Sequence, residues 1–490
     1  MTTIRLSELL QDVNVPDGAA VTGAEVSGIA YRSSRVVTGD AFFCIPGFVH
    51  DGHDFAAEAI RRGAAAVVAE RPVAGAGDVP VAIVRDTRAA LARGAAVFFG
   101  HPSRQMRVIG VTGTNGKTTT TYLVESIAAA AGHRTGLIGT VETRIADARV
   151  EAVRTTPESA DLQALFSKMR AAGVDTAVME VSSHAIDLHR VDGVRFEVAA
   201  FTNLSQDHLD YHHSIEEYYS VKRRLFTELD VAKRVVNVDD VYGAAIAAEL
   251  DDVLTVGRDE MADVRAVDEE PLPDGTRFTL VTPEWTERIE LPLSAGYNVS
   301  NALVAAGCAL AAGIGRAAVA QGLRRAPQVP GRLERVDAGQ DFAVFVDYAH
   351  TPDGLAKALR AVSVVTPGRV IAVFGCGGDR DPEKRPLMGA AAARESDHVI
   401  ITSDNPRSED PVGIILQIED GIRDSETPYE VIVDRAEAIG AALARASGGD
   451  AVVIAGKGHE DRQVFSDRSI RFDDREVARN ALEELCSRLR

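Results

Sequence analysis

The sequence predicts an α/β protein of three domains, in which helices cover mostly parallel sheets. The chain has 490 residues, which is more than one hydrophobic core usually accommodates. Short apolar stretches alternate with helical stretches through most of its length, and this alternation is typical of doubly wound parallel sheets. Changes in the pattern of the sequence near residue 102, and a segment rich in proline and glycine near residue 330, predict domains at residues 1–102, 103–331 and 332–490.

The first domain is expected to alternate short strands and helices. The first residues, "MTTIRLSELLQDV", have the pattern of a short amphipathic helix and not of a signal peptide. Residues 27–47 predict two strands around the turn 37–40. Residues 55–70 predict a helix, a glycine stop and a strand.

The other two domains show the clearest βα pattern. In the middle domain a buried strand at 106–111 is followed by a helix that ends at Gly132, and the acidic segment 258–290 is expected to be a β insertion or a loop. The last domain begins after a segment with two prolines and a glycine, a typical boundary. Its four expected apolar strands lie within residues 342–350, 369–379, 398–407 and 451–460.

Composition excludes several classes of function. The net charge of −19 disfavours non-specific binding to nucleic acid, which needs clustered cations. The four cysteines are far apart and form no CxxC pair, so neither a zinc site nor a disulfide framework is indicated. The longest apolar run is too short and too rich in glycine to span a membrane. We therefore expect a cytoplasmic protein with no nucleic-acid partner and no membrane insertion.

The stretch "VTGTNGKTTT" predicts a phosphate-binding loop between a strand and a helix. Val111 occupies the place where the Walker pattern has its first glycine, so this loop is a shorter variant. A plain glycine-rich turn is the alternative, but strand, loop, Gly-Lys-Thr and helix follow in the order that a nucleotide site needs. Lys117 would reach phosphate oxygens, and the Thr118 hydroxyl would hold Mg²⁺.

Three more residues of the middle domain are candidates for a role in the site. Glu180 ends an apolar strand, where a carboxylate can bind a metal beside phosphates, and His208 follows the next strand. Each alone is more often structural. Lys222 falls on the apolar face of a helix at 215–226, so it either turns outward along its stem or points inward with a chemical role.

Polar loops follow each expected strand of the last domain. They begin near Asp347 and His350, and continue at 375–381, 404–407 and 456–461. The loop "GCGGDRD" is not a dinucleotide fingerprint, because Arg380 occupies the third glycine position. Parallel strands end at one edge, so four loops rich in charged groups predict a site for a charged small molecule.

The motifs "GTNGKTTT", "EVSSHA", "TNLSQDHLDYH", "YNVSNAL", "GRLE", "DYAHTP", "GCGGDRD", "DNPR" and "AGKGHE" together resemble the Mur ligases of bacterial peptidoglycan synthesis. The resemblance covers about Ser27 to Glu460, and the short phosphate loop is the usual form in that family. It implies an N-terminal UDP-binding domain, a central ATPase domain and a C-terminal Rossmann-like domain that binds an amino acid.

The resemblance also implies site residues. The ATP site would comprise Gly113, Thr114, Asn115, Gly116, Lys117, Thr118, Thr119, Asn301, Arg332 and Asp347. The UDP-sugar-peptide would contact Ser34, Phe48, Val49, His50, Thr155, Thr156, Ser182 and Arg190. The acceptor would contact Arg380, Asp404, Asn405, Pro406, Arg407, Gly456 and Glu460. The catalytic groups would be Lys117, Glu180, His208 and Lys222, with Mg²⁺ on Thr118, Glu180, His208 and a CO₂-derived carbamate of Lys222.

The implied reaction joins a diamino acid to UDP-N-acetylmuramoyl-L-Ala-D-Glu through an acyl phosphate made from ATP. In this family the motif "DNPR" goes with meso-2,6-diaminopimelate, and relatives that add lysine lack its arginine. Arg407 would offer a bidentate fork to the second carboxylate of diaminopimelate. The implied partners are these small molecules, and the protein is expected to be a monomer.

Other functions remain open at this point. The same ligase could add L-lysine or another diamino acid, or the chain could be a different ligase of the superfamily, such as a folylpolyglutamate synthetase. It could also be a nucleotide-gated binding protein or a plain ATPase. Turnover of ATP that depends on both an acyl substrate and an amine separates the ligases from the last two.

Overall fold

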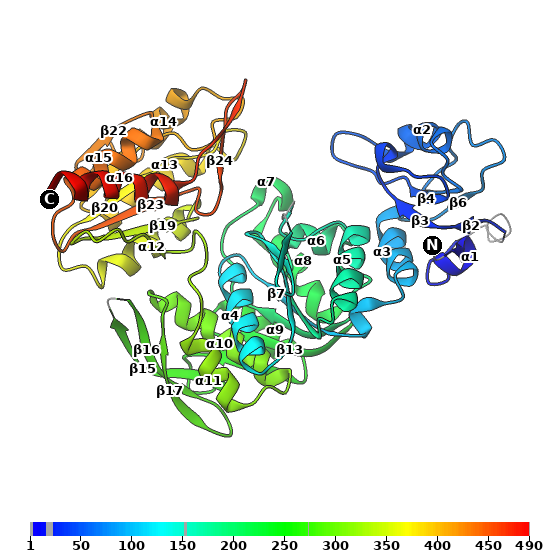
Figure 1. The fold of residues 1–490 in the computed structure, drawn as a ribbon, viewed down its shortest axis with the longest axis horizontal. Coiled ribbons are helices and arrows are strands. Elements are labelled where there is room, and N and C mark those ends of the chain that lie inside the picture. The colour runs from blue at the N-terminus through cyan, green and yellow to red at the C-terminus, as the bar shows by residue number, and fades with distance from the viewer. Residues whose placement is uncertain (1–2, 16–22, 151–153, 273, 490) are drawn as a thin grey trace.

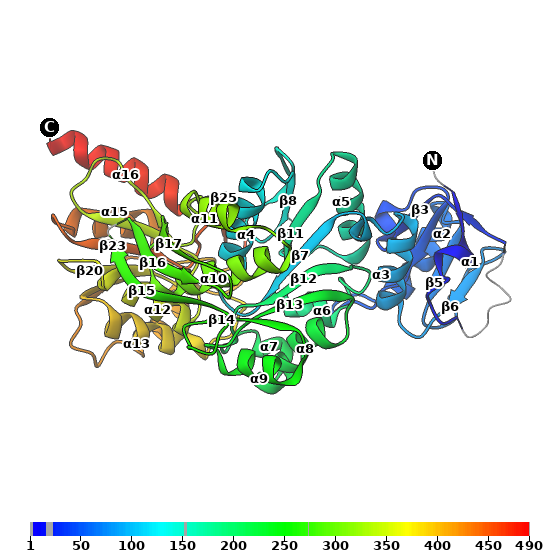
Figure 2. The same cartoon turned by 90° about the horizontal axis from the view of Figure 1, so that it is seen from below.

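Three main sheets, of four, eleven and six strands, follow one another along the chain and confirm the predicted α/β class (Figure 1). The structure is a computed structural model that describes residues 3–15, 23–150, 154–272 and 274–489. The three parts lie in a row, with the N-terminus and the C-terminal helix at opposite ends (Figures 1 and 2). Each main sheet falls within one of the expected domains, whose limits stay a prediction.

The N-terminal sheet is small and parallel, in the order β3–β4–β5–β6. Phe42 and Phe43 point to opposite faces of β4, and both are buried, because α2 covers one face and α3 the other. The elements are β1 (Ile4–Arg5), α1 (Leu6–Leu9), β2 (Glu25–Val26), β3 (Gly28–Ala30), β4 (Asp40–Phe43), α2 (Ala56–Arg61), β5 (Ala66–Ala69), β6 (Val81–Ile83) and α3 (Thr87–Phe98).

Two details of this domain could not be predicted from the sequence pattern. Strands β3 and β4 do flank the turn, but they are parallel neighbours, with Ile29 opposite Ala41, so the chain crosses over between them. The N-terminal helix is a single turn, because Ile4 pairs with Val26 in a short strand just before it. Periodicity cannot reveal either feature, since both depend on pairing with a distant segment.

The middle domain has one sheet of eleven strands, in the order β10-β9-β8-β11-β7-β12-β13-β14-β15-β16-β17. Strands β8 to β15 in this order are parallel, and antiparallel strands extend both edges. The strands are β7 (Arg107–Thr112), β8 (Thr135–Ile138), β9 (Thr143–Ile145), β10 (Ala148–Val150), β11 (Thr176–Glu180), β12 (Phe196–Phe201), β13 (Val231–Asn237), β14 (Val253–Gly257), β15 (Val264–Leu272), β16 (Gly275–Val281) and β17 (Thr286–Leu291).

Helices cover both faces of this sheet, as a doubly wound fold requires. One core forms under α4, α10 and α11, and the other under α5, α6, α8 and α9. The acidic segment 258–290 is β structure, because it supplies most of β15 to β17. The helices are α4 (Lys117–Ala130), α5 (Ser159–Ala171), α6 (Ser183–Asp187), α7 (Leu209–His212), α8 (Ile215–Thr227), α9 (Val241–Glu249), α10 (Gly296–Ala311) and α11 (Arg316–Arg324).

The C-terminal sheet has the order β18-β19-β23-β20-β21-β22, and all its strands except β18 are parallel. The elements are β18 (Glu334–Arg335), β19 (Ala343–Asp347), α12 (Pro352–Ser363), β20 (Val370–Phe374), α13 (Lys384–Glu395), β21 (His398–Ile401), α14 (Pro411–Glu419), β22 (Tyr429–Val431), α15 (Arg435–Arg445), β23 (Ala451–Ala455), β24 (Arg462–Val464), β25 (Ser469–Arg471) and α16 (Asp474–Leu489). Within the described residues, no helix is long and apolar enough to cross a membrane.

A fully buried ion pair attaches the last helix to the C-terminal sheet. Arg435, at the start of α15, and Asp474, at the start of α16, are both 0% exposed in their side chains and form two hydrogen bonds of 2.7 Å. Arg435 also donates to the carbonyl of Ala455 at 2.9 Å. Burial opposes the charge, but Asp474 outweighs it and raises the pKa of Arg435.

We predict that Arg435→Met strongly destabilises the C-terminal domain, because it leaves the Asp474 carboxylate buried without its partner. Losing one member of a buried pair costs about 3–5 kcal/mol. Thermal unfolding followed by circular dichroism should show an earlier transition. The control is Arg360→Ala, which breaks the exposed pair with Glu395 and should leave the transition in place. Equal behaviour of the two variants would contradict the prediction.

Candidate active site

The glycine-rich loop joins the end of β7 to the start of α4, as the sequence predicts. Gly113 and Gly116 have φ angles of 144° and 85°, which favour glycine. A Cβ on Gly116 would lie 2.2 Å from Asn301 Oδ1, so the fold also leaves no room for a side chain there. The N–H groups of the loop and of the first turn of α4 can therefore approach an anion closely.

The segment after β12 holds this loop in place. The Thr114 N–H donates to the Asn203 carbonyl at 2.8 Å, and the Asn115 N–H donates to Asn203 Oδ1 at 3.0 Å. Thr202 Oγ1 donates to the Asn115 carbonyl at 2.6 Å. Contacts within the protein therefore determine the path of the loop.

Lys117 lies inside the curve of the loop. Its Nζ donates to the carbonyls of Gly113 and Thr114, both at 2.9 Å. Burial lowers the pKa of Lys117, although the carboxylates of Glu180 and Asp207 oppose the shift. Phosphate groups would supply the anionic partner that this ammonium lacks.

Thr118 and Glu180 meet beside the loop. Thr118 Oγ1 donates to Glu180 Oε1 at 3.1 Å, and the backbone and hydroxyl of Thr140 donate to the same carboxylate at 2.8 and 3.1 Å. In the described part of the chain these are the hydrogen bonds to the Glu180 carboxylate, which is buried and forms no salt bridge. A hydroxyl beside a buried carboxylate fits Mg²⁺, which prefers oxygen ligands.

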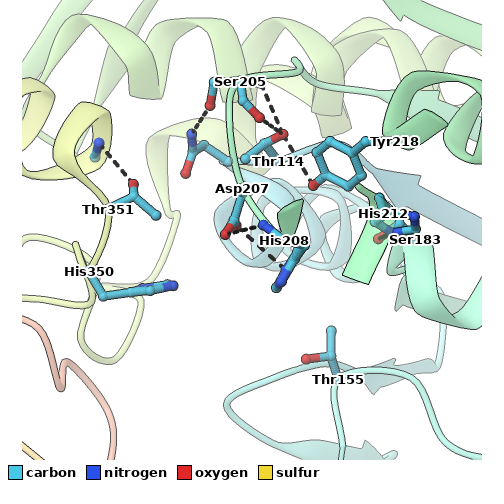
Figure 3. Close-up of polar contacts among 12 residues, drawn as sticks. Thr114, Thr155, Ser183, Ser205, Asp207, His208, His212, Tyr218, His350 and Thr351 are labelled. Atoms are coloured by element: carbon cyan, nitrogen blue, oxygen red, sulfur yellow. Dashed lines mark hydrogen bonds and ion pairs between the residues drawn. The ribbon is translucent and has the colours of Figure 1, made fainter. Parts of the chain in front are cut away.

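His208 and Asp207 lie on the same side of the cavity, and His350 reaches toward them from the C-terminal domain (Figure 3). His208 Nε2 lies 3.5 Å from Asp207 Oδ2. Burial opposes ionisation of Asp207, but His208, His350 and Lys117 outweigh it and lower its pKa. Across the described ranges, no group of three or more histidine, cysteine, aspartate or glutamate side chains is arranged to hold a metal.

Lys222 points inward, so the outward reading of this residue is wrong. Its side chain is 1% exposed, its Nζ donates to the Gly113 carbonyl at 2.8 Å, and it lies 4.6 Å from the centre of the Tyr218 ring. Burial, together with the nearby Lys117 ammonium, holds the pKa of Lys222 well below its usual range, against Asp207. Lys222 lies behind the loop and does not line the cavity described next, and its carbamylation stays a prediction.

A cavity of about 540 Å³ lies between the middle and C-terminal domains. Its walls combine the phosphate loop with residues 347–351 of the C-terminal domain. The predicted ATP residues that line it are Thr114, Asn115, Gly116, Lys117, Thr118, Thr119, Asn301, Arg332 and Asp347, which leaves only Gly113 behind the surface. The predicted metal residues Thr118, Glu180 and His208 line the same cavity.

The C-terminal domain supplies one wall of the predicted nucleotide site. Arg332 Nη2 donates to Thr118 Oγ1 at 3.2 Å, and its guanidinium lies 4.6 Å from the centre of the Tyr348 ring. Asp347 accepts from the backbone N–H groups of Leu333 and Ala349 at 2.6 and 2.8 Å. Burial raises the pKa of Asp347, although Arg332 opposes this shift.

The residues expected to bind the sugar-peptide form two layers. Thr155 and Ser182 line the cavity. Thr156 lies behind them, where its hydroxyl donates to the Glu180 carbonyl at 2.9 Å, and Arg190 Nη1 donates to the Thr156 carbonyl at 3.3 Å. Thr156 and Arg190 therefore support the wall, and they do not form part of its surface.

The residues expected to contact the uridine end lie apart from this cavity. Ser34, Phe48, Val49 and His50 belong to the N-terminal domain, and none of them lines the cavity. Phe48 and Val49 are 76% and 84% exposed. The Phe48 ring packs edge-on against Tyr211 of the middle domain, with 5.8 Å between the ring centres. This loop therefore faces the middle domain, and its role in substrate binding stays a prediction.

The acceptor residues of the C-terminal domain meet where its strands end. Asn405 Nδ2 donates to Glu460 Oε2 at 2.7 Å, which joins the loop after β21 to the loop after β23. Asp404, Asn405 and Pro406 are buried. Gly456 has a φ of 113°, and a Cβ there would lie 2.7 Å from Asp404 Oδ2. The structure thus brings the motifs "DNPR" and "AGKGHE", which lie about fifty residues apart in the sequence, into contact.

The two arginines of this region differ in environment. Arg407 has a φ of 53°, and its Nη1 donates to the Gly378 carbonyl at 2.7 Å, so its guanidinium faces the loop after β20. Arg380 belongs to that loop and is exposed, with one hydrogen bond to the carbonyl of Asp379.

Several residues of the site were missed from the sequence. Thr140 follows β8 and binds Glu180, so the rule that polar residues follow parallel strands could have found it. Asp207 had no signal beyond its position next to His208. Lys457 stood within a recognised motif, but its complete burial depends on the tertiary fold.

Comparison with known proteins places this geometry in a family. Three descriptions match successive parts of the chain: "Mur ligase family, catalytic domain" at residues 25–84, "Mur ligase middle domain" at 111–309 and "Mur ligase, glutamate ligase domain" at 331–458. A Bacillus licheniformis protein named UDP-N-acetylmuramoyl-L-alanyl-D-glutamate--2,6-diaminopimelate ligase is 47% identical, over 98% of this chain and 100% of its own length. A Syntrophomonas wolfei protein of that name is 44% identical, over 98% and 99%.

Solved structures agree with these relatives. A structure of a protein with the same ligase name matches 99% of this chain and 100% of its own, with a TM-score of 0.71 and 31% identity. The MurF ligase from Thermotoga maritima in complex with ADP, at 20% identity and a TM-score of 0.65, shares the fold over 95% and 99%. The phosphate loop, the facing C-terminal loops and the full-length likeness lead to one conclusion: the chain belongs to the Mur ligase family.

Proposed function

We propose that this protein is the ATP-dependent ligase that joins meso-2,6-diaminopimelate to UDP-N-acetylmuramoyl-L-Ala-D-Glu in peptidoglycan precursor synthesis. The observation that carries the proposal is the cavity between the phosphate loop and the C-terminal domain. A phosphoryl donor can be held on one wall while an amine enters from the other. The names of relatives up to 48% identical over nearly the whole chain support the same substrates.

The reaction has two steps. A carboxylate oxygen of the dipeptide attacks the γ-phosphorus of ATP, which gives an acyl phosphate and releases ADP. The amine nitrogen of diaminopimelate then attacks the acyl carbon, which forms the amide, loses a proton and releases phosphate. Lys117 and the loop N–H groups would stabilise negative charge on the transferring group, which is where preorganised donors contribute most.

Mg²⁺ would be held by Thr118 and Glu180, and a second ion by His208 together with a carbamate on Lys222. These ions would neutralise charge on the phosphate oxygens. Thr118 Oγ1 and Glu180 Oε1 already lie 3.1 Å apart, and both are oxygen atoms, the ligands that Mg²⁺ prefers. Arg332 lies next to Thr118, where it can bind phosphate oxygens as well.

A carbamate on Lys222 agrees with the state of this amine. Carbamate forms when a neutral amine attacks CO₂ and releases one proton. Burial and the neighbouring Lys117 favour neutral Lys222, because they hold its pKa well below the usual range. The product would be an anion close to the Lys117 ammonium, which would attract it.

The acceptor would bind at the ends of β21 and β23. Arg407 would recognise the second carboxylate of diaminopimelate, and Glu460 its distal ammonium, with Asn405, Gly456 and Arg380 beside them. Lysine lacks that carboxylate and would leave Arg407 without its partner. The cost of this unpaired charge would make the enzyme strongly prefer diaminopimelate over lysine.

The remaining substrate would extend from the cavity toward the N-terminal domain. Thr155 and Ser182 would contact the sugar-peptide, with Thr156 and Arg190 supporting them, and Ser34 and residues 48–50 would contact the uridine end. We further propose that the enzyme acts in the cytoplasm as a monomer.

The first prediction of the proposed function concerns the acceptor. With ATP, Mg²⁺ and UDP-N-acetylmuramoyl-L-Ala-D-Glu, phosphate release should require meso-diaminopimelate, and L-lysine should not replace it. Arg407→Ala should raise the KM for diaminopimelate by about ten- to a hundredfold, the value of a charge-assisted hydrogen bond, and leave the KM for ATP unchanged. Turnover with lysine would refute the role of Arg407, and absence of any amine-dependent turnover would refute the ligase.

The second prediction concerns the phosphate loop. Gly116 and Gly132 both have a φ of 85°, but only Gly116 lies against Asn301, and Gly132 faces open space. Each change to alanine should cost roughly 1–2 kcal/mol of stability from the left-handed backbone. Only Gly116→Ala should also raise the KM for ATP, by about tenfold or more, because its Cβ displaces Asn301. An equal KM in both variants would contradict the steric argument.

The third prediction concerns Lys222. Protein equilibrated with ¹³C-bicarbonate should show a carbamate carbon signal by NMR, and this signal should be absent in Lys222→Gln. Removal of CO₂ should lower the rate of the ligase reaction, and added bicarbonate should restore it. A spectrum of the wild-type protein without the carbamate signal would refute the modification, whatever the activity.

A further inference from the structure

Lys457 is a buried cation that the proposed reaction has not used. It lies in the loop after β23, and its side chain is 0% exposed. Its Nζ donates to Asn405 Oδ1 at 3.2 Å, to Glu460 Oε2 at 3.3 Å and to the carbonyl of Arg462. The three N–H groups of the ammonium therefore have three acceptors, two of which belong to proposed acceptor-binding residues.

Asn405 completes a closed set of contacts with Lys457 and Glu460. Its Nδ2 donates to Glu460 Oε2 at 2.7 Å, so two donors converge on the same carboxylate oxygen. Its Oδ1 also accepts from the backbone N–H of Val464 at 3.0 Å, which ties the group to β24. The orientation of Glu460 is thus determined by an ammonium and an amide from two different loops.

These contacts leave the second oxygen of Glu460 available. Within the described residues, no hydrogen bond to Glu460 Oε1 is found, and the side chain is 33% exposed. A carboxylate with one oxygen held by the protein and the other open to solvent is suited to accept a hydrogen bond from a cationic ligand. Lys457 also places a positive charge 3.3 Å from Glu460 Oε2, on the side of the carboxylate that faces the protein.

Burying the Lys457 ammonium costs desolvation free energy, which its contacts must offset. A buried charge needs full pairing, and an apolar side chain of similar volume would fill the space without that cost. The two neighbours of Lys457 in the motif are glycines, and Gly458 lies against Tyr348 with no room for a Cβ. The loop is therefore already held by close packing, and the charge of Lys457 adds a specific orientation of Glu460 and Asn405.

We propose that Lys457 is a positioning residue for the acceptor, which sets Glu460 so that Oε1 receives the distal ammonium of diaminopimelate. This inference rests on the proposed function. Lys457 touches neither ATP nor the reacting carboxylate, so its effect is confined to the second substrate.

The test compares two acceptors in wild type and in Lys457→Met. One acceptor is meso-diaminopimelate and the other is 2-aminopimelate, which lacks the distal ammonium. In the variant the KM for diaminopimelate should rise by on the order of tenfold, and the KM values for ATP and for the UDP-dipeptide should stay unchanged. The preference for diaminopimelate over 2-aminopimelate, measured as a ratio of kcat/KM, should fall by a similar factor.

Two further variants make the outcome decisive. Lys233→Met removes an exposed lysine that donates to the Ala311 carbonyl in the middle domain, and it should change none of these constants. Lys457→Gln keeps a donor for Glu460 and should show a smaller shift in the same direction, and it carries the test if Lys457→Met does not fold.

The inference is overturned if Lys457→Met weakens both acceptors equally, since that result indicates a loss of loop structure and not of the contact with the ammonium. It is also overturned if the KM for ATP rises in parallel. Absence of amine-dependent turnover in the wild type refutes the proposed function instead, so the two failures are distinguishable.

Discussion

The hydrogen bonds that tie the glycine loop to residues 202–203 are the constraint on which the rest of the site depends. They set the direction of the Gly113 carbonyl, which accepts from both Lys117 and Lys222. Two positive charges at one buried carbonyl oxygen would repel each other, so a neutral Lys222 beside Lys117 is favoured. An anion next to Lys117 would stabilise its charge, and phosphate and the proposed carbamate are both anions.

In the C-terminal domain, buried charged side chains likewise hold loops, here the loops that we propose bind the acceptor. Arg385, in α13, is 1% exposed. It donates to the Gly377 carbonyl in the loop after β20 and to Glu409, just beyond the "DNPR" motif. Lys457 joins the loops after β21 and β23 in the same way. Since unpaired buried charges are costly, each of these residues allows few arrangements of the loops it connects.

Much of this organisation could be predicted because it follows from periodicity and local chemistry. The alternation of strands and helices predicts the parallel sheets, and the apolar face of residues 215–226 marks Lys222 as a lysine in an unusual position. Pairing partners could not be predicted in the same way. The parallel register of β3 and β4 and the shortened first helix both depend on segments distant in the chain. Thr140 was missed because its role consists of a contact with Glu180, forty residues away.

The class of the fold, the phosphate loop and the residue types of the site follow from the amino-acid sequence, because they depend on neighbours along the chain. Tertiary packing determines which of those residues share a surface. It brings Thr118, Glu180 and His208 into the lining of one cavity and leaves Lys222 and the uridine-end residues outside that lining. The reason is physical: burial and hydrogen-bond partners come from segments far apart in sequence, and only packing of the sheets brings them together.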